Sequence, residues 1–488
     1  MTSNASEPER LSTGSVSFDR ILGGGLPLRS RIVVAGEPGA GKTLFALQAL
    51  FHLSRQGKKC IYFTTLSEPS LKLVHHMQQL SFFDAEAIGD RLIFVDLGSV
   101  LQRNDGAAAL EVIAERVERE EPVLVVIDSF KAMRDALGDA PQIRRFVYDL
   151  AVRVAGWGAA TLLLGEYTEE EMASFAEFAI ADGIIRFGTS RDDLTAIRTV
   201  EVLKLRGADC VTGRHFFEIG ADGLTFYARV RSPDADVDPE TAPIAERAST
   251  GVAGLDEMLG GGLPRSSATV VQGATGTGKT LLGLRFLLEG ARRGEPGIHF
   301  TLEETAGQVR WAAAALGWDL RDLEERRLLT LCYVSPVELS TDAFLDRALK
   351  LVTRVGARRA VLDSLTSMAL GVPSARRFKE LVYSIAKHFR AMGVTLSLNM
   401  EIAELLGSAQ LSGQGVSFAA DNLIQIRYVE VDGNLERGVS VLKARGLSHS
   451  TGVRRLTIGE DGVEVGAPFD GLRGVLTGLP TPAGAGAR

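Results

Sequence analysis

Residues 36–43 and 273–280 repeat one arrangement of glycine, lysine and threonine, roughly 237 residues apart. The first stretch reads Gly-Glu-Pro-Gly-Ala-Gly-Lys-Thr and the second reads Gly-Ala-Thr-Gly-Thr-Gly-Lys-Thr, so both fit the pattern G-x-x-x-x-G-K-T. Glycines at these positions let backbone N–H groups converge on phosphate oxygens, while the lysine reaches the terminal phosphates. The pattern therefore predicts two nucleotide sites, formed by Gly36, Gly39, Ala40, Gly41, Lys42 and Thr43 and by Gly273, Gly276, Thr277, Gly278, Lys279 and Thr280.

Each of these loops stands between a strand-like and a helix-like stretch. The apolar runs 32–35 and 268–271 precede the loops, and helical patterns begin at Leu44 and Leu281. A helix that starts at the loop directs the positive end of its dipole at the phosphates. This order of strand, loop and helix is the context that the motif requires for phosphate binding.

Two further apolar runs end in an aspartate. Residues 123–127 lead to Asp128, and residues 360–362 lead to Asp363. In a parallel sheet such strand ends lie at the edge where ligands bind, so we expect both carboxylates beside the phosphate loops. Each aspartate could instead only cap the helix that comes next, with the adjacent serine sharing the task. We favour a Mg²⁺ site built by Thr43 with Asp128 and by Thr280 with Asp363.

Carboxylates that could orient or deprotonate a nucleophile come after a short strand-like run in each half. The second half has two of them, Glu303 and Glu304. At the aligned positions the first half has Ser67 and retains only Glu68. Adjacent acids are usually just a solvated helix start, but their place between the two nucleotide motifs favours catalysis.

A lysine and an arginine lie two residues apart on a late strand-like run in each half, as Lys204 with Arg206 and as Lys443 with Arg445. This spacing points both side chains of a pair to one face of the strand. Such a pair on an edge strand commonly prevents edge-to-edge association. In assembled ATPases, basic side chains from a neighbouring subunit neutralise the charge on the transferring phosphate. Because the pair recurs at the same place, we favour a role in binding a neighbour's nucleotide.

The loops, aspartates and basic pairs belong to a longer repeat. A Ser-Thr-Gly block at residues 12–14 and 249–251 precedes a Leu-Gly-Gly-Gly-Leu-Pro block at residues 22–27 and 259–264. All blocks recur in the same order at nearly constant offset, which indicates a duplicated α/β domain. Apolar strands alternate with helical patterns, which predicts mostly parallel sheets flanked by helices. We expect a first domain at 1–231, an acidic, proline-rich linker at 232–247, a second domain at 248–470 and a flexible tail at 471–488.

The composition of the 488 residues is ordinary for a soluble globular protein, with 45% hydrophobic and 24% charged residues. No apolar run is long enough to span a bilayer, and residues 1–10 lack a signal-peptide pattern. Cys60, Cys210 and Cys332 are isolated, which suits a reducing cytoplasm rather than a disulfide framework or a zinc site. A net charge of −7 argues against a broad surface for nucleic acid. We expect a cytoplasmic protein without a membrane or nucleic-acid partner.

Together these blocks resemble the KaiC family of RecA-like ATPases over about residues 10 to 470. The resemblance implies two RecA-like domains per chain, stacked as a two-tiered hexamer with ATP and Mg²⁺ at subunit interfaces. It assigns slow ATP hydrolysis to the first half and autophosphorylation to the second, and it leaves room for a regulatory protein partner. By the same resemblance, Glu303 and Glu304 are paired catalytic glutamates with Glu68 as their counterpart, and Lys204, Arg206, Lys443 and Arg445 act on a neighbour's ATP.

The phosphoacceptors of that family are an adjacent serine and threonine shortly before an aspartate. Here Asp421 comes after a segment in which Ser417 matches the serine and Phe418 stands at the threonine position. We therefore expect at most one phosphoacceptor, Ser417, with Ser412 as the second choice, and no two-site phosphorylation cycle. Ser417 could equally be a simple hydroxyl at the edge of the core.

Two other functions share a RecA-like core, since the fold alone does not choose a function. The first is a DNA recombinase or helicase, which the pI of about 5.7 and the lack of an appended basic domain weaken. The second is a nucleotide-gated scaffold with negligible turnover. Retention of the lysine, threonine and aspartate in both halves weakens the scaffold, so we favour an ATPase with serine autokinase activity.

Overall fold

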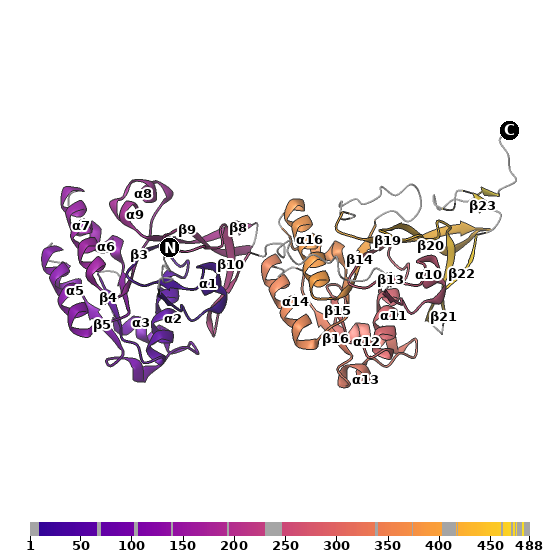
Figure 1. The fold of residues 1–488 in the computed structure, drawn as a ribbon, viewed down its shortest axis with the longest axis horizontal. Helices are drawn as coiled ribbons and strands as arrows, with labels where there is room; N and C mark the ends of the chain where they lie inside the picture. The colour runs from indigo at the N-terminus through magenta and orange to yellow at the C-terminus, as the bar shows by residue number, and fades with distance from the viewer. Residues whose placement is uncertain are drawn as a thin grey trace, which may run out of the picture. The chain divides into compact units, whose positions relative to one another are not determined.

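The computed structural model divides the chain into two compact units, the first unit (Met1–Arg229) and the second unit (Val230–Arg488), drawn in Figure 1. The boundaries of the repeat at residues 231 and 248 stay a prediction. The linker expected at 232–247 lies outside the described residues except for its last two. The structure describes residues 9–65, 70–101, 106–137, 140–192, 195–229, 246–336, 340–372, 374–402, 416, 418–459, 462–469, 472–473, 475 and 481–482.

The first unit alternates strands with helices along the chain. Its strands are β1 (Arg10–Leu11), β2 (Leu26–Pro27), β3 (Arg31–Gly36), β4 (Cys60–Thr64), β5 (Leu92–Asp96), β6 (Leu124–Asp128), β7 (Ala160–Gly165), β8 (Gly183–Asp192), β9 (Thr195–Leu205), β10 (Arg214–Gly220) and β11 (Gly223–Tyr227). Its helices are α1 (Val16–Ile21), α2 (Lys42–Arg55), α3 (Ser70–Met77), α4 (Gly98–Leu101), α5 (Gly106–Glu120), α6 (Phe130–Asp135), α7 (Ala140–Gly156), α8 (Glu169–Ser174) and α9 (Ala176–Ile180), with a 3₁₀ helix η1 at Ala85–Ala87.

The second unit repeats this order. Its strands are β12 (Arg247–Ala248), β13 (Leu263–Pro264), β14 (Ala268–Gly273), β15 (Gly297–Thr301), β16 (Leu329–Tyr333), β17 (Arg359–Asp363), β18 (Thr395–Glu401), β19 (Asn422–Val431), β20 (Asn434–Ala444), β21 (Arg454–Gly459), β22 (Gly462–Pro468), β23 (Leu472–Arg473) and β24 (Thr481–Pro482). Its helices are α10 (Ala253–Met258), α11 (Lys279–Arg292), α12 (Ala306–Ala314), α13 (Leu320–Glu325), α14 (Thr341–Val355), α15 (Leu365–Leu370) and α16 (Ala375–Ala391).

Each unit is built on a nine-stranded sheet, ordered β11-β10-β9-β8-β3-β7-β6-β4-β5 in the first and β22-β21-β20-β19-β14-β18-β17-β15-β16 in the second. The strands from β8 to β5 and from β19 to β16 are parallel to one another. The three remaining strands of each sheet run antiparallel. The predicted α/β fold with mostly parallel sheets is confirmed, and an antiparallel extension of the same length is added to each sheet.

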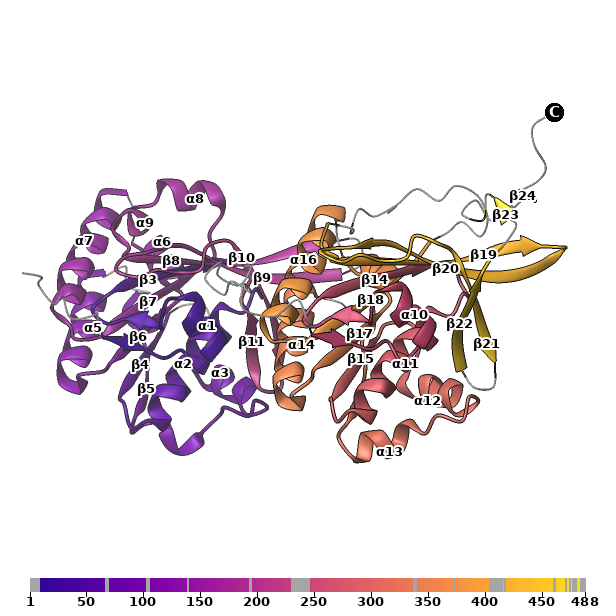
Figure 2. The same ribbon diagram turned by 45° about the vertical axis from the view of Figure 1, so that its right-hand side comes forward.

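The central parallel strands of each sheet are buried on both faces, which explains the nearly continuous apolar runs in the sequence. Along β3, Ile32 and Val34 pack in one hydrophobic cluster, while Val33 and Ala35 pack in another on the opposite face. Helices α1 and α2 contribute to the first of these clusters, and α5 and α7 contribute to the second (Figure 1). In the second unit, α10 and α11 cover one face and α14 and α16 cover the other (Figure 2).

The strand order brings distant segments of each unit to one edge. Strand β3 lies beside β7, and β7 lies beside β6, with all three parallel. The phosphate loop leaves the carboxyl end of β3, and Asp128 ends β6, so both lie at the same edge of the sheet. Strands β14, β18 and β17 repeat the arrangement in the second unit. Among the described residues, no helix is long and apolar enough to cross a membrane.

A buried arginine stabilises the second unit where the first has an apolar residue. Arg359 begins β17, is 1% exposed, and donates from Nε to Glu295 Oε2 at 2.7 Å. Its Nη1 donates to the carbonyl oxygens of Ser249 (2.7 Å) and Phe286 (2.9 Å). The Phe286 ring lies 4.6 Å from the guanidinium carbon, and a Cβ at Gly290 would come within 2.5 Å of Arg359 Cδ. The corresponding residue of β6 is the buried Leu124, whose side chain has no polar atom.

We expect Arg359→Ala to lower the free energy of unfolding by about 3–5 kcal/mol, because it removes one partner of a buried ion pair and the donor to two carbonyl oxygens. Differential scanning calorimetry should show a lower melting temperature. Arg376→Ala is the control, because that arginine has an 89% exposed side chain and pairs with Glu380 across one helical turn. Equal shifts for the two variants would contradict the structural role of Arg359.

Candidate functional site

Each phosphate loop folds back over the lysine that ends it. Gly41 (φ 97°) and Gly278 (φ 101°) adopt the left-handed conformation directly before α2 and α11, where only glycine is unstrained. Lys42 Nζ donates to the carbonyl oxygens of Gly36 (3.0 Å) and Glu37 (2.8 Å). Lys279 Nζ makes the same two bonds, to Gly273 and Ala274, both at 2.8 Å. The two loops therefore hold their ammonium groups identically.

Burial lowers the pKa of both loop lysines. Nearby carboxylates oppose this effect, led by Glu166 for Lys42 and by Glu401 for Lys279. These two glutamates occupy equivalent positions, since Glu166 comes directly after β7 and Glu401 ends β18. Phosphate oxygens arriving at the loop would raise both pKa values again, because an anion beside a desolvated ammonium stabilises its charged form.

The loop threonine and the strand-end aspartate are in direct contact in both units. Thr43 Oγ1 donates to Asp128 Oδ2 at 2.6 Å, and Thr280 Oγ1 donates to Asp363 Oδ2 at 2.6 Å. A hydroxyl and a carboxylate side by side form the all-oxygen donor set that Mg²⁺ prefers. The residues present at both loops thus fit a magnesium ion.

The same aspartates receive a further contact that the sequence analysis missed. Tyr62 OH donates to Asp128 Oδ2 at 2.7 Å in the first unit. At the equivalent position of β15, His299 Nε2 lies 3.9 Å from Asp363 Oδ2. Burial would raise the pKa of Asp363, but the interactions with His299, Thr280 and Asn399 outweigh it and lower that pKa. A polar residue in the middle of an apolar strand next to the aspartate strand was the available signal.

The serines, not the aspartates, cap helices α6 and α15. Ser129 Oγ accepts from the backbone N–H of Ala132 (3.1 Å), and Ser364 Oγ accepts from that of Ser367 (3.3 Å). The peptide bond between aspartate and serine is cis in both units. Capping therefore does not account for Asp128 and Asp363, whose carboxylates turn toward the loop threonines instead.

The paired glutamates of the second unit lie between β15 and α12. Glu303 Oε1 accepts from Ser364 Oγ and from Ser367 Oγ, each at 2.5 Å. Burial raises the pKa of Glu304, and the charges of Asp363 and Glu303 act in the same direction. Their expected counterpart Glu68, together with Ser67, lies outside the described residues, as do the candidate phosphoacceptors Ser417 and Ser412.

A cleft of about 740 Å³ opens at the carboxyl edge of the first sheet. It is lined by residues of the loop and of the neighbouring strand ends, among them Gly39, Gly41, Lys42, Thr43, Asp128 and Glu166. A second cleft of about 580 Å³ lies against Gly36 and Pro38 and shares Lys131 and Glu166 with the first. Both clefts fall within the size of small-molecule sites.

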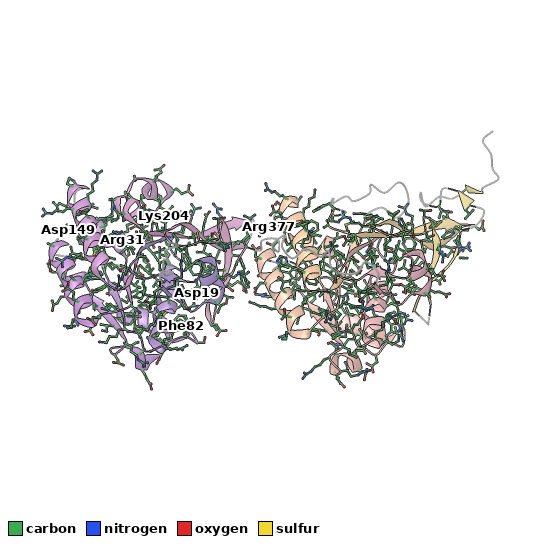
Figure 3. The ribbon with its side chains drawn as sticks, in the orientation of Figure 1. Asp19, Arg31, Phe82, Asp149, Lys204 and Arg377 are labelled. Atoms are coloured by element: carbon green, nitrogen blue, oxygen red, sulfur yellow. The ribbon has the colours of Figure 1, made fainter. Side chains whose placement is uncertain are left out.

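The basic pairs lie at the opposite edge of each sheet from the loops. Lys204 pairs with Ile184 at the start of β8, and the backbone N–H of Arg206 donates to Asp182 O at 2.8 Å. The backbone N–H of Asp182 in turn donates to Arg31 O (2.8 Å), at the first residue of β3 (Lys204 and Arg31 are labelled in Figure 3). The loop begins at the last residue of β3, about 16 Å away at about 3.3 Å per residue. Neither side chain is therefore brought to the loop of its own unit.

The second pair repeats this placement. Arg445 donates through its backbone to Asp421 O (3.0 Å), which precedes β19, and Lys443 Nζ donates to Ala420 O (2.7 Å). Strands β9 and β20 also have neighbours on both sides in their sheets. The second neighbour pairs only with residues 199–201 of β9 and 437–439 of β20, so the segments that carry Lys204 and Lys443 pair on one side, and protection of an edge stays an alternative.

A tyrosine and an arginine that the sequence analysis missed lie against the second loop. Tyr428 OH donates to Thr275 O (3.4 Å), and Arg437 Nε donates to Gly276 O (3.3 Å). The Arg437 guanidinium carbon lies 5.6 Å from the centre of the Tyr428 ring. Thr275 Oγ1 also donates to Glu401. In the first loop, Pro38 stands at the place of Thr275 and has no hydroxyl for such a bond.

Comparison with known protein families gives one match, described as "ATPase: KaiC", at residues 11–231 and again at residues 248–469. The chain is 28% identical over 483 residues to the circadian clock oscillator protein KaiC of Picosynechococcus sp., covering 97% of this chain and 92% of that protein. It is 29% identical over 482 residues to the protein of the same name from Rippkaea orientalis, covering 97% and 91%. Circadian clock protein KaiC3 of Synechocystis sp. is 29% identical over 492 residues, covering 97% and 94%.

The family match falls on both repeats and spans both nine-stranded sheets with their phosphate loops. The relatives are similar over nearly their whole length as well as that of this chain. The chain therefore belongs to the KaiC family of ATPases.

Proposed function

We propose that each unit binds ATP with Mg²⁺ and hydrolyses it, and that the second unit also phosphorylates a serine of the protein. The observation that carries this proposal is the contact of loop threonine with strand-end aspartate beside the loop lysine, present twice in one chain. Binding needs the lysine for the terminal phosphates, and both lysines are already held at the loop. Thr43 with Asp128 and Thr280 with Asp363 are the residues that would hold Mg²⁺, which neutralises phosphate charge when bound.

The chemistry on the γ-phosphate falls to the glutamates. In the second unit, Glu303 takes the proton of the attacking hydroxyl, and Glu304 lies beside it with a raised pKa. In the first unit we assign hydrolysis of ATP to Glu68, which is the remaining carboxylate of the pair. One carboxylate suits the slow activation of water, whereas transfer to a side chain also requires an acceptor held in line.

A neighbouring copy of the chain completes each site in this proposal. The basic pairs Lys204/Arg206 and Lys443/Arg445 lie a full strand length from the loop of their own unit, so we assign them to the loop of another copy. Membership of the KaiC family favours oligomeric assembly, and we propose an ATP-dependent hexamer. A cytoplasmic location and a regulatory protein partner are further parts of the proposal.

The first prediction concerns nucleotide binding. Lys42→Ala and Lys279→Ala should each leave about one ATP bound per chain, and the double variant should bind none, because each loop loses its phosphate-directed ammonium. Equilibrium dialysis with a non-hydrolysable ATP analogue and Mg²⁺ measures the stoichiometry. Lys350→Ala, whose exposed side chain pairs with Asp346, is the control. Full occupancy in the double variant would refute the two sites.

The second prediction concerns assembly. Saturating ATP should convert the chain to a hexamer, and Lys42→Ala should impair this more than Lys279→Ala, since we assign assembly mainly to the first unit. Sedimentation velocity with and without nucleotide reports the change. A chain that stays monomeric at micromolar concentration in saturating ATP would count decisively against the shared sites.

The third prediction concerns phosphoryl transfer to the protein. Incubation with ATP and Mg²⁺ should place at most one phosphate per chain, on Ser417 in preference to Ser412, because Phe418 removes the second acceptor. Glu303→Gln should abolish the modification by removing the base, while hydrolysis in the first unit continues. Intact-mass and peptide mass spectrometry decide the matter. Equal phosphate on wild type and Glu303→Gln, or phosphate only in the first unit, would show the mechanism to be wrong.

A further inference from the structure

Two serine hydroxyls converge on one oxygen of Glu303 in the second unit. Ser364 Oγ and Ser367 Oγ each donate to Glu303 Oε1 at 2.5 Å, and the two hydroxyl oxygens lie 3.3 Å apart. We propose that these two serines form a clamp that positions Glu303 for proton transfer. Ser364 also caps α15, whereas the hydroxyl of Ser367 serves the clamp alone. The inference rests on the proposed function, because a clamp on Glu303 affects catalysis only if Glu303 is the base.

The clamp is built on a rigid support. Ser364 is 2% exposed and precedes α15, and Ser367 is 9% exposed and lies in the first turn of that helix. Ser364 Oγ also accepts from the backbone N–H of Ser367 at 3.3 Å, so the helix start holds the Ser364 hydroxyl in place. Ser364 itself comes directly after Asp363, which contacts the phosphate loop through Thr280. The position of the Glu303 carboxylate is thus tied to the loop.

Glu303 needs such support more than a core residue does. Its side chain is exposed and leaves a short connection between β15 and α12, where several rotamers are open to it. Holding Oε1 leaves Oε2 as the oxygen that can accept a proton. In hydrolysis as in transfer to serine, the proton of the attacking O–H passes to Oε2 while that oxygen bonds to the γ-phosphorus and the bond to the oxygen of the leaving ADP breaks. Orientation of the base contributes to the rate of such a step.

The first unit shows that the hydroxyl of Ser367 is not needed by the helix. Ser364 corresponds to Ser129, which caps α6. Ser367 corresponds to Ala132, whose backbone N–H still donates to Ser129 Oγ at 3.1 Å. In the sequence alignment of the two halves, Ser67 stands opposite Glu303. By that alignment, the second half has both the carboxylate of Glu303 and the hydroxyl of Ser367, and the first half has neither at the corresponding positions. An alanine at Ser367 is accordingly compatible with the fold.

A double-mutant cycle on the full-length chain tests the clamp. Steady-state phosphate release in ATP and Mg²⁺ is measured for wild type, Ser367→Ala, Glu303→Gln and the double variant, and the rate of Lys279→Ala, which lacks nucleotide at the second loop, is subtracted as that of the first unit. We expect Ser367→Ala to reduce kcat of the second unit about 10-fold with KM for ATP changed less than about 2-fold, since the clamp orients the base without touching ATP. Ser367→Thr retains the hydroxyl and should keep kcat within about 3-fold of wild type.

The double variant should release phosphate at the rate of Glu303→Gln alone, because the clamp acts only through the carboxylate. An equal further loss in both backgrounds would mean that Ser367 only supports the fold, and the clamp would be refuted. A wild-type rate for Ser367→Ala beside a low rate for Glu303→Gln would refute the clamp while leaving Glu303 as the base. A wild-type rate for Glu303→Gln would overturn the role of Glu303 in the proposed function, and the clamp with it.

Discussion

The hydrogen bond from the loop threonine to the strand-end aspartate joins residues 85 positions apart in the first unit and 83 apart in the second. It can form only where the loop strand and the aspartate strand are parallel and end at the same edge, with one strand between them. The apolar faces that pack against α2 and α7, or α11 and α16, hold those strands in register. Burial of the sheet thus positions the two oxygens that we propose as metal ligands.

Around this shared frame the two units differ in the groups that could perform chemistry. The strand-end aspartate accepts a hydrogen bond from Tyr62 in the first unit and lies beside His299 in the second. The second loop is bound by Tyr428 and Arg437, and its glutamate position is occupied by Glu303 with two serine donors. These differences are typical of a duplicated domain whose two copies kept the phosphate loop and the strand-end aspartate and diverged in the residues around them.

The sequence predicts those features that depend on local order along the chain. The loop conformation results from Gly41 and Gly278, the parallel core results from continuous apolar runs, and the threonine–aspartate contacts result from strand ends in such a sheet. Contacts between side chains of separate segments, such as Ser367 with Glu303, escaped it because they depend on strand order and rotamer. The place of β9 and β20 between other strands could not be predicted either, because no sequence motif marks the antiparallel strands of each sheet.

The central claim is that two equivalent ATP–Mg²⁺ sites exist per chain and that a neighbouring copy completes them. An experimental structure of the assembled protein with a non-hydrolysable ATP analogue and Mg²⁺ tests it most directly. The account predicts metal density at Thr43 and Asp128 and at Thr280 and Asp363, with Lys204 and Lys443 of an adjacent copy at the γ-phosphates. Nucleotide bound away from the loops, or both sites closed by residues of the same chain, would contradict it.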